Sequence, residues 1–352
     1  MIGICQTEGS SRITSQILHI VYASDRNYAE MLGVSMISLF ENNRGNEIRL
    51  YILDGGIAEE DLGRMEDICR SYGQPALCRI PAEDISGILN MDVAADRGSR
   101  AQFSRIFISR YIDESIDRIL YLDCDTIIRR PLTELWNIDL GGHTIAALDD
   151  AFSVQYRKNA DLQPDDIMFN SGVMLIDLKK WRDSAAEEKA LSFIRSRHGF
   201  AEKGDQGVLN AVLSRECLCF DPVFNAVTIF FDFSYKEMLA YRKPPAYYSE
   251  EEVARAVRDP VIIHYTMSFL SKRPWMTGCR HPWTDEWLKY KKMSPWRDVP
   301  PAEEHRSWRV RAMRRLPRPL MLWSAGLLQA YGRPWLYRVR LKKLMKKQAR
   351  RA

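Results

Sequence analysis

Short apolar segments alternate with longer amphipathic ones in the first third of the chain, and this alternation restricts the fold more than any other feature. The apolar segments span residues 18–23, 47–53 and 75–80, and helical patterns cover residues 28–43 and 58–73 between them. Parallel strands need a crossover connection of this length, which is usually a helix. The pattern therefore predicts an α/β protein built on a doubly wound parallel sheet.

The rest of the body continues this mixture. We expect an amphipathic helix over residues 100–113, a strand over 118–123, a strand running into a helix over 169–182, a short buried helix over 205–213 and a strand over 260–266. With 352 residues, of which 46% are hydrophobic, the chain can bury a substantial core. We divide it into an N-terminal extension, a globular domain and a basic tail, at residues 1–17, 18–300 and 301–352.

Acidic and polar residues stand where several of the expected strands end. The clusters are Ser24–Asp25, Asp123–Asp125, Asp149–Asp150 and His264. In doubly wound sheets, ligands bind beyond the carboxyl ends of the strands, so these side chains can share one site. The sequence contains no P-loop, and no G-x-G-x-x-G follows a strand. A bound nucleotide would therefore need a metal ion in place of a glycine-rich phosphate loop.

The D-x-D triplet at Asp123 and Asp125 predicts a metal site. Side chains alternate along an extended segment, so the two carboxylates lie on one side and Cys124 on the other. Carboxylates so close repel unless a cation lies between them, and hard divalent ions prefer oxygen ligands. His264 adds an imidazole, which favours Mn²⁺ and leaves Mg²⁺ as the alternative. The competing interpretation makes the aspartates exposed loop caps and His264 a core histidine.

Six segments, taken together and in order, resemble the family-8 retaining glycosyltransferases, the group that includes bacterial lipopolysaccharide galactosyl- and glucosyltransferases and glycogenin. The resemblance covers about residues 18–290. The segments are HIVYASDRNYAEMLGVSMISLFENN, FSRIFI, RILYLDCDTIIRRPLTELWNIDL, FNSGVMLIDLKKWR, DQGVLN and IIHY followed by RPW. This resemblance implies an A-type glycosyltransferase fold, a Rossmann-like mixed sheet flanked by helices. It also implies a UDP-sugar donor and Mn²⁺.

The resemblance implies roles for individual positions. The uridine-binding segment corresponds to Ala23, Asp25, Asn27 and Tyr28, with the carboxylate accepting from the uracil and the tyrosine stacking on it. The metal ligands correspond to Asp123, Asp125 and His264, and Asp123 also lies near the ribose and sugar hydroxyls. The contacts to the donor sugar correspond to Arg105, Asp150 and Asn170. The pair beside the anomeric carbon corresponds to Asp205 and Gln206. Each of three positions also has a purely structural interpretation when taken alone. Arg105 can be a solvated helix arginine, Asn170 can cap a turn, and Gln206 can stand at the start of a helix.

Two positions depart from the family pattern. The family often reads D-Q-D where this chain has Asp205, Gln206 and Gly207, so no carboxylate stands at the third place. Lys272 and Arg273 precede the final Pro-Trp in place of a single lysine, and either cation can neutralise a departing UDP. Retention of configuration needs a double displacement or a front-face path. Without the third carboxylate we expect the front-face path, with Asp205 left as a possible nucleophile.

The tail carries a charge of the opposite sign to the body. From Arg306 onward it holds 15 Lys and Arg and no acid, which leaves 36 Lys and Arg against 46 Asp and Glu, a net charge of −10, in the rest. A helical wheel places Tyr337, Leu341, Leu344 and Met345 on one side, as in an amphipathic helix at an anionic membrane surface. Nucleic-acid binding is the rival interpretation, and we do not expect it.

The cysteines and the N-terminal sequence indicate in which cellular compartment the protein works. Seven scattered cysteines without a C-x-x-C indicate a reducing environment, and the N-terminus lacks the pattern of a secretory signal. We therefore expect a cytoplasmic protein held at the inner face of the membrane. The predicted function is transfer of galactose or glucose from a UDP-sugar to a glycan or lipid-linked acceptor such as lipopolysaccharide. The alternative is a non-catalytic protein of the same fold that binds a membrane or nucleic acid through its tail.

Overall fold

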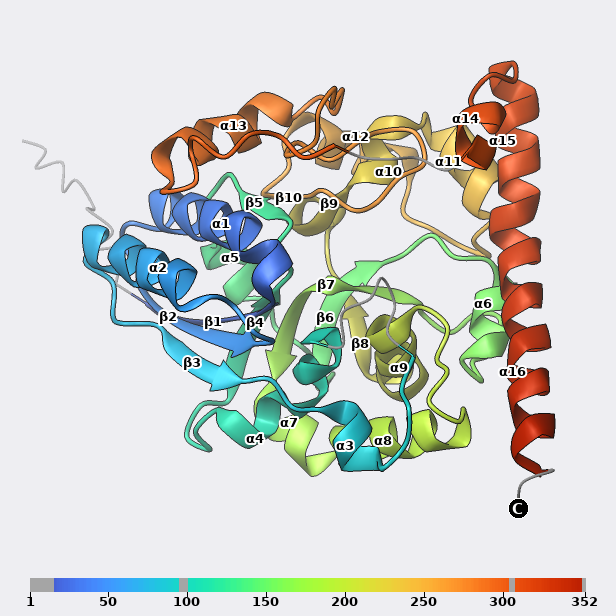
Figure 1. Cartoon of the computed structure of the whole chain (residues 1–352), viewed down its shortest axis with the longest axis horizontal. Helices are drawn as coiled ribbons and strands as arrows, with labels where there is room; N and C mark the ends of the chain where they lie inside the picture. Colours follow the sequence, from blue (N-terminus) through green and yellow to red (C-terminus); the bar gives the residue numbers. More distant parts are fainter. Residues whose placement is uncertain (1–15, 95–100, 304–307, 350–352) are drawn as a thin grey trace, which may run out of the picture.

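The computed structural model describes residues 16–94, 101–303 and 308–349, and most of the expected N-terminal extension lies outside these residues (Figure 1). The strands are β1 Ile17–Ser24, β2 Glu47–Asp54, β3 Cys78–Pro81, β4 Arg118–Leu122, β5 Thr126–Ile128, β6 Ile145–Asp149, β7 Phe169–Asp177, β8 Cys217–Cys219, β9 Ala226–Val227 and β10 Ile262–His264. The α-helices are α1 Ala29–Asn42, α2 Glu59–Ser71, α3 Ile85–Leu89, α4 Ile108–Tyr111, α5 Thr133–Trp136, α6 Val154–Asn159, α7 Leu178–Asp183, α8 Ala186–Ser196, α9 Gly204–Leu213, α10 Thr228–Asp232, α11 Tyr235–Arg242, α12 Glu250–Arg258, α13 Thr284–Met293, α14 Trp308–Met313, α15 Arg318–Leu327 and α16 Arg333–Ala349. Short 3₁₀ segments are η1 Arg26–Tyr28, η3 Ala101–Phe107, η4 Ser214–Glu216 and η5 Pro222–Asn225, and η6 Leu328–Gly332 is a π-helical turn.

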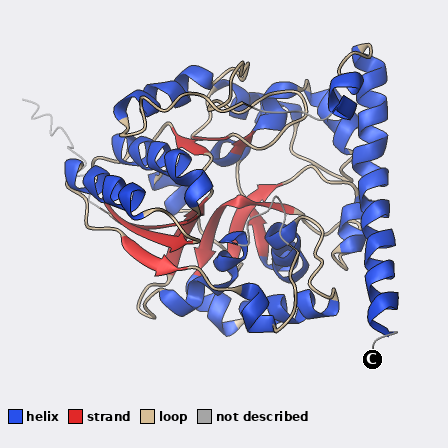
Figure 2. Ribbon diagram, in the orientation of Figure 1, coloured by secondary structure: helices blue, strands red, loops and turns tan. Residues whose placement is uncertain are grey.

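A seven-stranded sheet with the order β3-β2-β1-β4-β7-β6-β8 forms the centre of the molecule (Figure 2). The pairs among β3, β2, β1 and β4 are parallel, as the alternation of strands and helices predicts. β7 runs antiparallel to both of its neighbours, β4 and β6. The purely parallel sheet is therefore wrong, and the mixed sheet of the A-type glycosyltransferase fold is confirmed.

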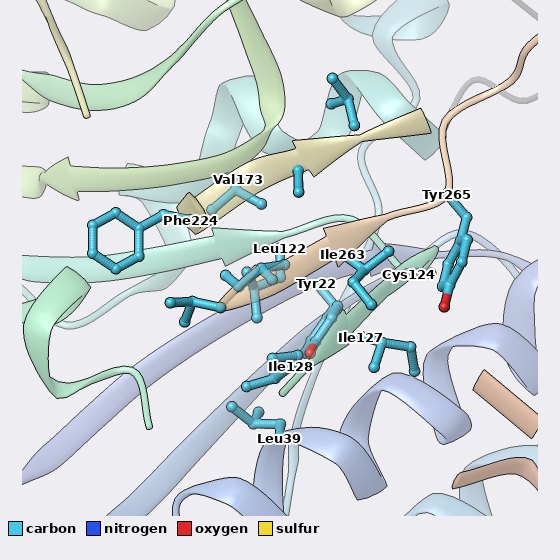
Figure 3. Close-up of a cluster of buried hydrophobic side chains, with 14 of the residues drawn as sticks. Tyr22, Leu39, Leu122, Cys124, Ile127, Ile128, Val173, Phe224, Ile263 and Tyr265 are labelled. Atoms are coloured by element: carbon cyan, nitrogen blue, oxygen red, sulfur yellow. The ribbon is translucent and has the colours of Figure 1, made fainter. Parts of the chain in front are cut away.

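Helices cover both faces of this sheet, and each face has its own hydrophobic core (Figure 1). Successive side chains of a strand point to opposite faces, so Ile20 and Tyr22 enter one core and Val21 the other. Leu122, Val173 and Ile263 pack in the first core, in the cluster drawn in Figure 3. This two-sided burial explains why β1 and β4 read as apolar runs without a polar face.

A small three-stranded sheet with the order β5-β10-β9 lies beside the first core. β10 pairs antiparallel with β5 and parallel with β9. Because only three residues separate β4 from β5, this sheet brings the late strand β10 to the end of β4.

The expected helix over residues 100–113 is divided. η3 occupies Ala101–Phe107 and a single turn, α4, follows at Ile108–Tyr111, while residue 100 lies outside the described residues. The expected short helix near residue 205 is α9, and the strand that runs into a helix is β7 followed by α7. Both of these predictions are confirmed.

The C-terminal segment forms one long helical rod, α15–η6–α16, along one side of the body (Figure 1). Met321 and Leu322 are buried in the first core, and the Ser153 hydroxyl donates a 2.6 Å hydrogen bond to the Ala330 carbonyl. Tyr337 and Leu341 are buried as well, so these two members of the predicted apolar side are not available to a membrane, whereas Leu344 and Met345 are exposed. No helix in the described part of the chain is long and apolar enough to cross a membrane.

Candidate functional site

The D-x-D segment and His264 meet at one point, as the sequence predicts. One ligand atom from each of Asp123, Asp125 and His264 lies within 4.8 Å of the others. The Nε2 atom of His264 is 3.1 Å from Oδ1 of Asp125 and 3.7 Å from Oδ2 of Asp123. Two carboxylates and an imidazole at this spacing can hold a divalent ion of the Mn²⁺ or Mg²⁺ type.

Three elements place these ligands. Asp123–Asp125 form the turn that joins β4 to β5, and not the extended segment that alternation suggested, although the Cys124 thiol does point away, toward the Ala23 carbonyl. His264 pairs with Thr126 across the small sheet, and the Tyr265 amide donates to the Asp125 carbonyl at 2.9 Å. The antiparallel pairing of β5 with β10 therefore sets the distance between histidine and carboxylates.

Asn225 fixes which nitrogen of His264 faces the carboxylates. Nδ1 of His264 is 2.9 Å from Oδ1 of Asn225, and Nδ2 of the same amide donates to Oδ1 of Asn170 at 3.1 Å. Because the amide oxygen can only accept, Nδ1 carries the proton and Nε2 keeps its lone pair for a metal. The sequence offered no signal for Asn225, which stands in an apolar stretch far from both of its partners.

Gly172 leaves space for this cluster. A Cβ atom at this position would lie 2.2 Å from the His264 ring and 2.7 Å from Oδ2 of Asp123. The glycine of the FNSG segment is therefore a steric requirement of the site, and the sequence alone carries no signal that marks it.

Arg105 is buried and neutralises part of the acidic charge. Its Nη2 donates to Oδ1 of Asp123 at 3.0 Å, its Nε lies 2.9 Å from Oδ2 of Asp205, and its guanidinium stacks on the Tyr121 ring. This placement rules out a solvated helix arginine. Burial raises the pKa of Asp205 to about 6, and the positive charge of Arg105 opposes that rise. Asp205 thus faces Arg105 at the back of the site.

A cavity of about 390 Å³ opens on the metal ligands. The other polar side chains predicted for the donor sugar, Asp150, Asn170 and Gln206, line it as well. Oδ2 of Asp150 accepts from Nδ2 of Asn170 at 3.4 Å and lies 3.5 Å from Nε2 of Gln206. Asp149, the other acid of the predicted Asp149–Asp150 cluster, instead accepts from the Met168 amide at 3.3 Å, and burial raises its pKa to about 7.

The residues predicted to hold uridine lie at the end of β1. Ala23 is the next-to-last residue of β1, and Asp25 accepts from the Asn27 amide at 2.9 Å and so starts η1, which ends at Tyr28. The Tyr28 hydroxyl accepts from Nη1 of Arg273 at 2.9 Å, and Nη2 of that arginine is 3.5 Å from Oδ2 of Asp125. Lys272 instead donates to the Thr277 carbonyl at 2.7 Å. Of the two cations, Arg273 is therefore the one next to the metal ligands.

Gly207, the departure from D-Q-D, has a steric cause. A Cβ atom there would lie 1.8 Å from the Glu202 carbonyl oxygen. The close approach follows from a turn in which Lys203 and Gly204 both have positive φ, +66° and +58°. An aspartate at position 207 does not fit this backbone.

Comparison with known proteins agrees with this geometry. The sequence pattern of glycosyl transferase family 8 matches residues 19–279. The chain belongs to glycosyltransferase family 8. General stress protein A of Bacillus subtilis is 31% identical over 81% of this chain and 96% of its own length. Lipopolysaccharide 1,2-glucosyltransferase of Escherichia coli is 27% identical over 82% of each chain.

Solved structures show the same fold for this family-8 chain. The galactosyltransferase LgtC, in complex with donor and acceptor sugar analogues, superimposes with a TM-score of 0.65 and 25% identity, over 79% of this chain and 96% of its own. The glycosyltransferase GlyE of Streptococcus pneumoniae has a TM-score of 0.57 at 23% identity, over 80% of this chain and 62% of its own. The A-type glycosyltransferase fold is thus established for the body, with a helical C-terminal region packed against it.

Proposed function

We propose that this family-8 glycosyltransferase is a retaining hexosyltransferase that moves galactose or glucose from a UDP-sugar to a glycan acceptor, such as lipopolysaccharide or another cell-surface glycan. The observation that carries the proposal is the convergence of Asp123, Asp125 and His264 at the wall of a cavity that Asp150, Asn170 and Gln206 also line. The relatives named above, a lipopolysaccharide glucosyltransferase and a galactosyltransferase, support the choice of a hexose.

The donor would lie across the end of the sheet. Uridine would contact Ala23, Asp25, Asn27 and Tyr28, and the diphosphate would face the metal ligands and Arg273. Asp123, Asp125 and His264 would hold the metal, which we propose to be Mn²⁺ with Mg²⁺ as the substitute, and the bound ion would neutralise negative charge on the diphosphate as a Lewis acid. Arg273 adds a cation on the same side, since it already reaches both Tyr28 and Asp125.

A front-face path fits the surroundings of the proposed anomeric position better than a double displacement. Gln206, which lines the cavity, carries an amide and cannot form a glycosyl ester. Asp205, the carboxylate that directly precedes Gln206 in the chain, is paired with Arg105 and buried away from solvent. In the front-face path the acceptor hydroxyl attacks while the leaving phosphate oxygen takes its proton, and Gln206 orients the sugar.

The tail supports a proposal about location, a cytoplasmic enzyme bound to the inner face of a membrane. The exposed apolar side chains of the rod recur every three or four residues, at Leu320, Trp323, Leu327, Tyr331 and Trp335. Exposed lysines and arginines follow along α16. Aromatic rings beside cations are typical of helices that lie at an anionic lipid surface.

Asp125→Asn tests the proposed chemistry directly. We expect wild-type protein to hydrolyse UDP-galactose or UDP-glucose slowly in Mn²⁺ without an acceptor. Asp125→Asn should abolish this hydrolysis and weaken UDP binding in Mn²⁺, because one metal ligand is lost. Asp183→Asn, which changes an exposed carboxylate on α7, is the matched control and should behave as wild type.

Two outcomes would contradict the proposal. Equal, metal-independent UDP affinity in wild type and Asp125→Asn would show that Asp125 does not bind a metal ion that holds UDP. If GDP or ADP raises the melting temperature as much as UDP does, the residues at the end of β1 do not select uridine. A protein that binds vesicles or nucleic acid but hydrolyses no UDP-sugar would instead support the non-catalytic alternative.

A further inference from the structure

Three cations line the end of the cavity that the donor chemistry leaves unused. Lys203 stands just before α9, Arg242 ends α11, and Arg333 begins α16. They share this cavity with the metal ligands, but they come from other elements. Lys203, Arg242 and Arg333 are called the cation cluster below.

The cation cluster has few partners of its own. Within the described residues, Lys203 and Arg242 make no ion pair and no side-chain hydrogen bond, and Nε and Nη1 of Arg242 are buried without an acceptor. Arg333 donates to the neutral Oε1 of Gln329 at 2.8 Å. Buried donors without acceptors are costly, and the cost is removed when a ligand supplies acceptors.

Aromatic rings hold two of the cations in place. Nζ of Lys203 lies 4.6 Å from the centre of the Phe152 ring, and the Arg242 guanidinium carbon lies 4.9 Å from it. A ring face attracts a cation without cancelling its charge, so both remain available to an anion. Burial, followed by the charge of Arg242, lowers the pKa of Lys203 to about 8, while Asp150 raises it. A bound anion would relieve this repulsion between like charges.

The backbone is shaped to present Lys203. The residue has a positive φ of +66°, which is unfavourable for a side chain with a Cβ. The tight turn around it also requires Gly207, as described above. Strained backbone at a cavity wall is a frequent mark of a ligand-binding position.

In the proposed function the donor diphosphate faces Arg273 and the metal ion that Asp123, Asp125 and His264 would hold, so the charge of the cation cluster is left for another group. Lys203 stands two residues before Asp205 and lines the same cavity as Asp150 and Gln206, the residues that we place beside the reacting sugar. Resting on the proposed hexosyltransferase function, we propose that the cation cluster is a subsite for a phosphate group on the acceptor. Three cations around one pocket suit a dianion, and the phosphate can be an ester on a sugar of the glycan or part of a lipid diphosphate.

Binding of small probes tests the subsite without turnover. Wild-type protein saturated with UDP and Mg²⁺ is titrated with glucose 6-phosphate and with glucose, and we expect at least tenfold tighter binding of the phosphate. Lys203→Met and Arg242→Gln should each reduce this preference about tenfold. A short-chain prenyl-diphosphate sugar forms the second arm, and tighter binding of this probe than of glucose 6-phosphate identifies the lipid diphosphate as the source.

Lys243→Met is the matched control, because Lys243 also has a positive φ, adjoins Arg242 and is exposed. The proposal is overturned if wild type binds glucose 6-phosphate no better than glucose, or if Lys243→Met loses as much preference as Lys203→Met. If the protein prefers glucose 6-phosphate over glucose but hydrolyses no UDP-sugar, the hexosyltransferase function is wrong and the anion subsite is supported.

Discussion

At the scale of single residues, the candidate metal site depends on a neighbour outside the three candidate ligands. Asn225 accepts from Nδ1 of His264 and so leaves Nε2 directed at Asp123 and Asp125. The three ligands were predictable because each stands at the end of an apolar run. Asn225 was not, since its importance arises only when η5 and β10 lie side by side.

Asn225→Ala should therefore weaken metal binding without removing a ligand. The loss of the acceptor frees the imidazole to rotate or change tautomer, and we expect a 10- to 100-fold lower Mn²⁺ affinity by calorimetry in the presence of UDP. Asn225→Asp keeps an acceptor for Nδ1 and should retain most of the affinity. If both variants lose affinity equally, the hydrogen bond is not what positions His264.

A second histidine gives the protein a pH-dependent stability. Burial lowers the pKa of His281 to about 4, below its ordinary value of 6.5. Between these values the unfolded chain binds the proton and the folded chain does not. The free energy of unfolding should therefore fall as the pH drops from 6.5 toward 4, by at most about 1.4 kcal/mol per pH unit from this group.

His281→Asn isolates this effect. The amide oxygen can replace Nδ1 as acceptor for the Trp283 amide, a bond of 3.2 Å, and the side chain does not titrate. Urea unfolding of both proteins at intervals from pH 4.5 to 7.5 should give a shallower loss of stability for the variant. If the free energy of unfolding falls equally steeply with decreasing pH in both proteins, His281 does not contribute to the acid sensitivity.

At the scale of elements, close packing explains features that a helical pattern alone does not. α1 is buried on nearly all sides, and Gly33 lies against the Trp296 ring, where a Cβ would be 2.0 Å from a ring carbon. The existence and approximate ends of α1 were predictable from periodicity. This contact was not, because Trp296 comes from a segment more than 260 residues away along the chain.

Gly33→Ala should destabilise the protein by about 1–3 kcal/mol, because the methyl group overpacks the tryptophan. Gly63→Ala on α2 is the control, since nothing lies within 4 Å of its Cβ, and it should stabilise by about 0.5–1 kcal/mol. In a Trp296→Leu background the cost of Gly33→Ala should largely disappear. Additive effects in thermal unfolding of the double variant would argue against the contact.

At the scale of the whole molecule, the tail is more closely joined to the body than its composition suggests. Its charge and apolar content predicted a helix, but which face is exposed depends on the packing of α15 and α16 against α6 and α11. The inner face supplies Gln329 and Arg333 to the cavity, while Trp323 and Trp335 face solvent. Composition alone cannot distinguish these two faces.

The exposed face should carry the membrane affinity. Replacing Trp323 and Trp335 with serine should reduce co-sedimentation with anionic vesicles at low salt several-fold, while UDP-sugar hydrolysis in solution stays unchanged. High salt should release much of the wild-type protein, because the cations act within about a Debye length.

Met293→Ser, which changes an exposed apolar residue on α13, is the control for this pair. If the full-length protein ignores anionic vesicles but binds RNA or DNA tightly, nucleic acid replaces the membrane as the partner of the tail.

The turn that presents Lys203 also restricts how the chain can evolve. As long as the Glu202 carbonyl lies where it does, position 207 accepts glycine alone. A lineage that gains an aspartate there must first, or at the same time, rearrange residues 202–204. Among relatives, the third position of the D-Q-x triplet and the residue at position 203 should therefore change together. The preference for a phosphate on the acceptor that we propose should then vary with the residue at that third position.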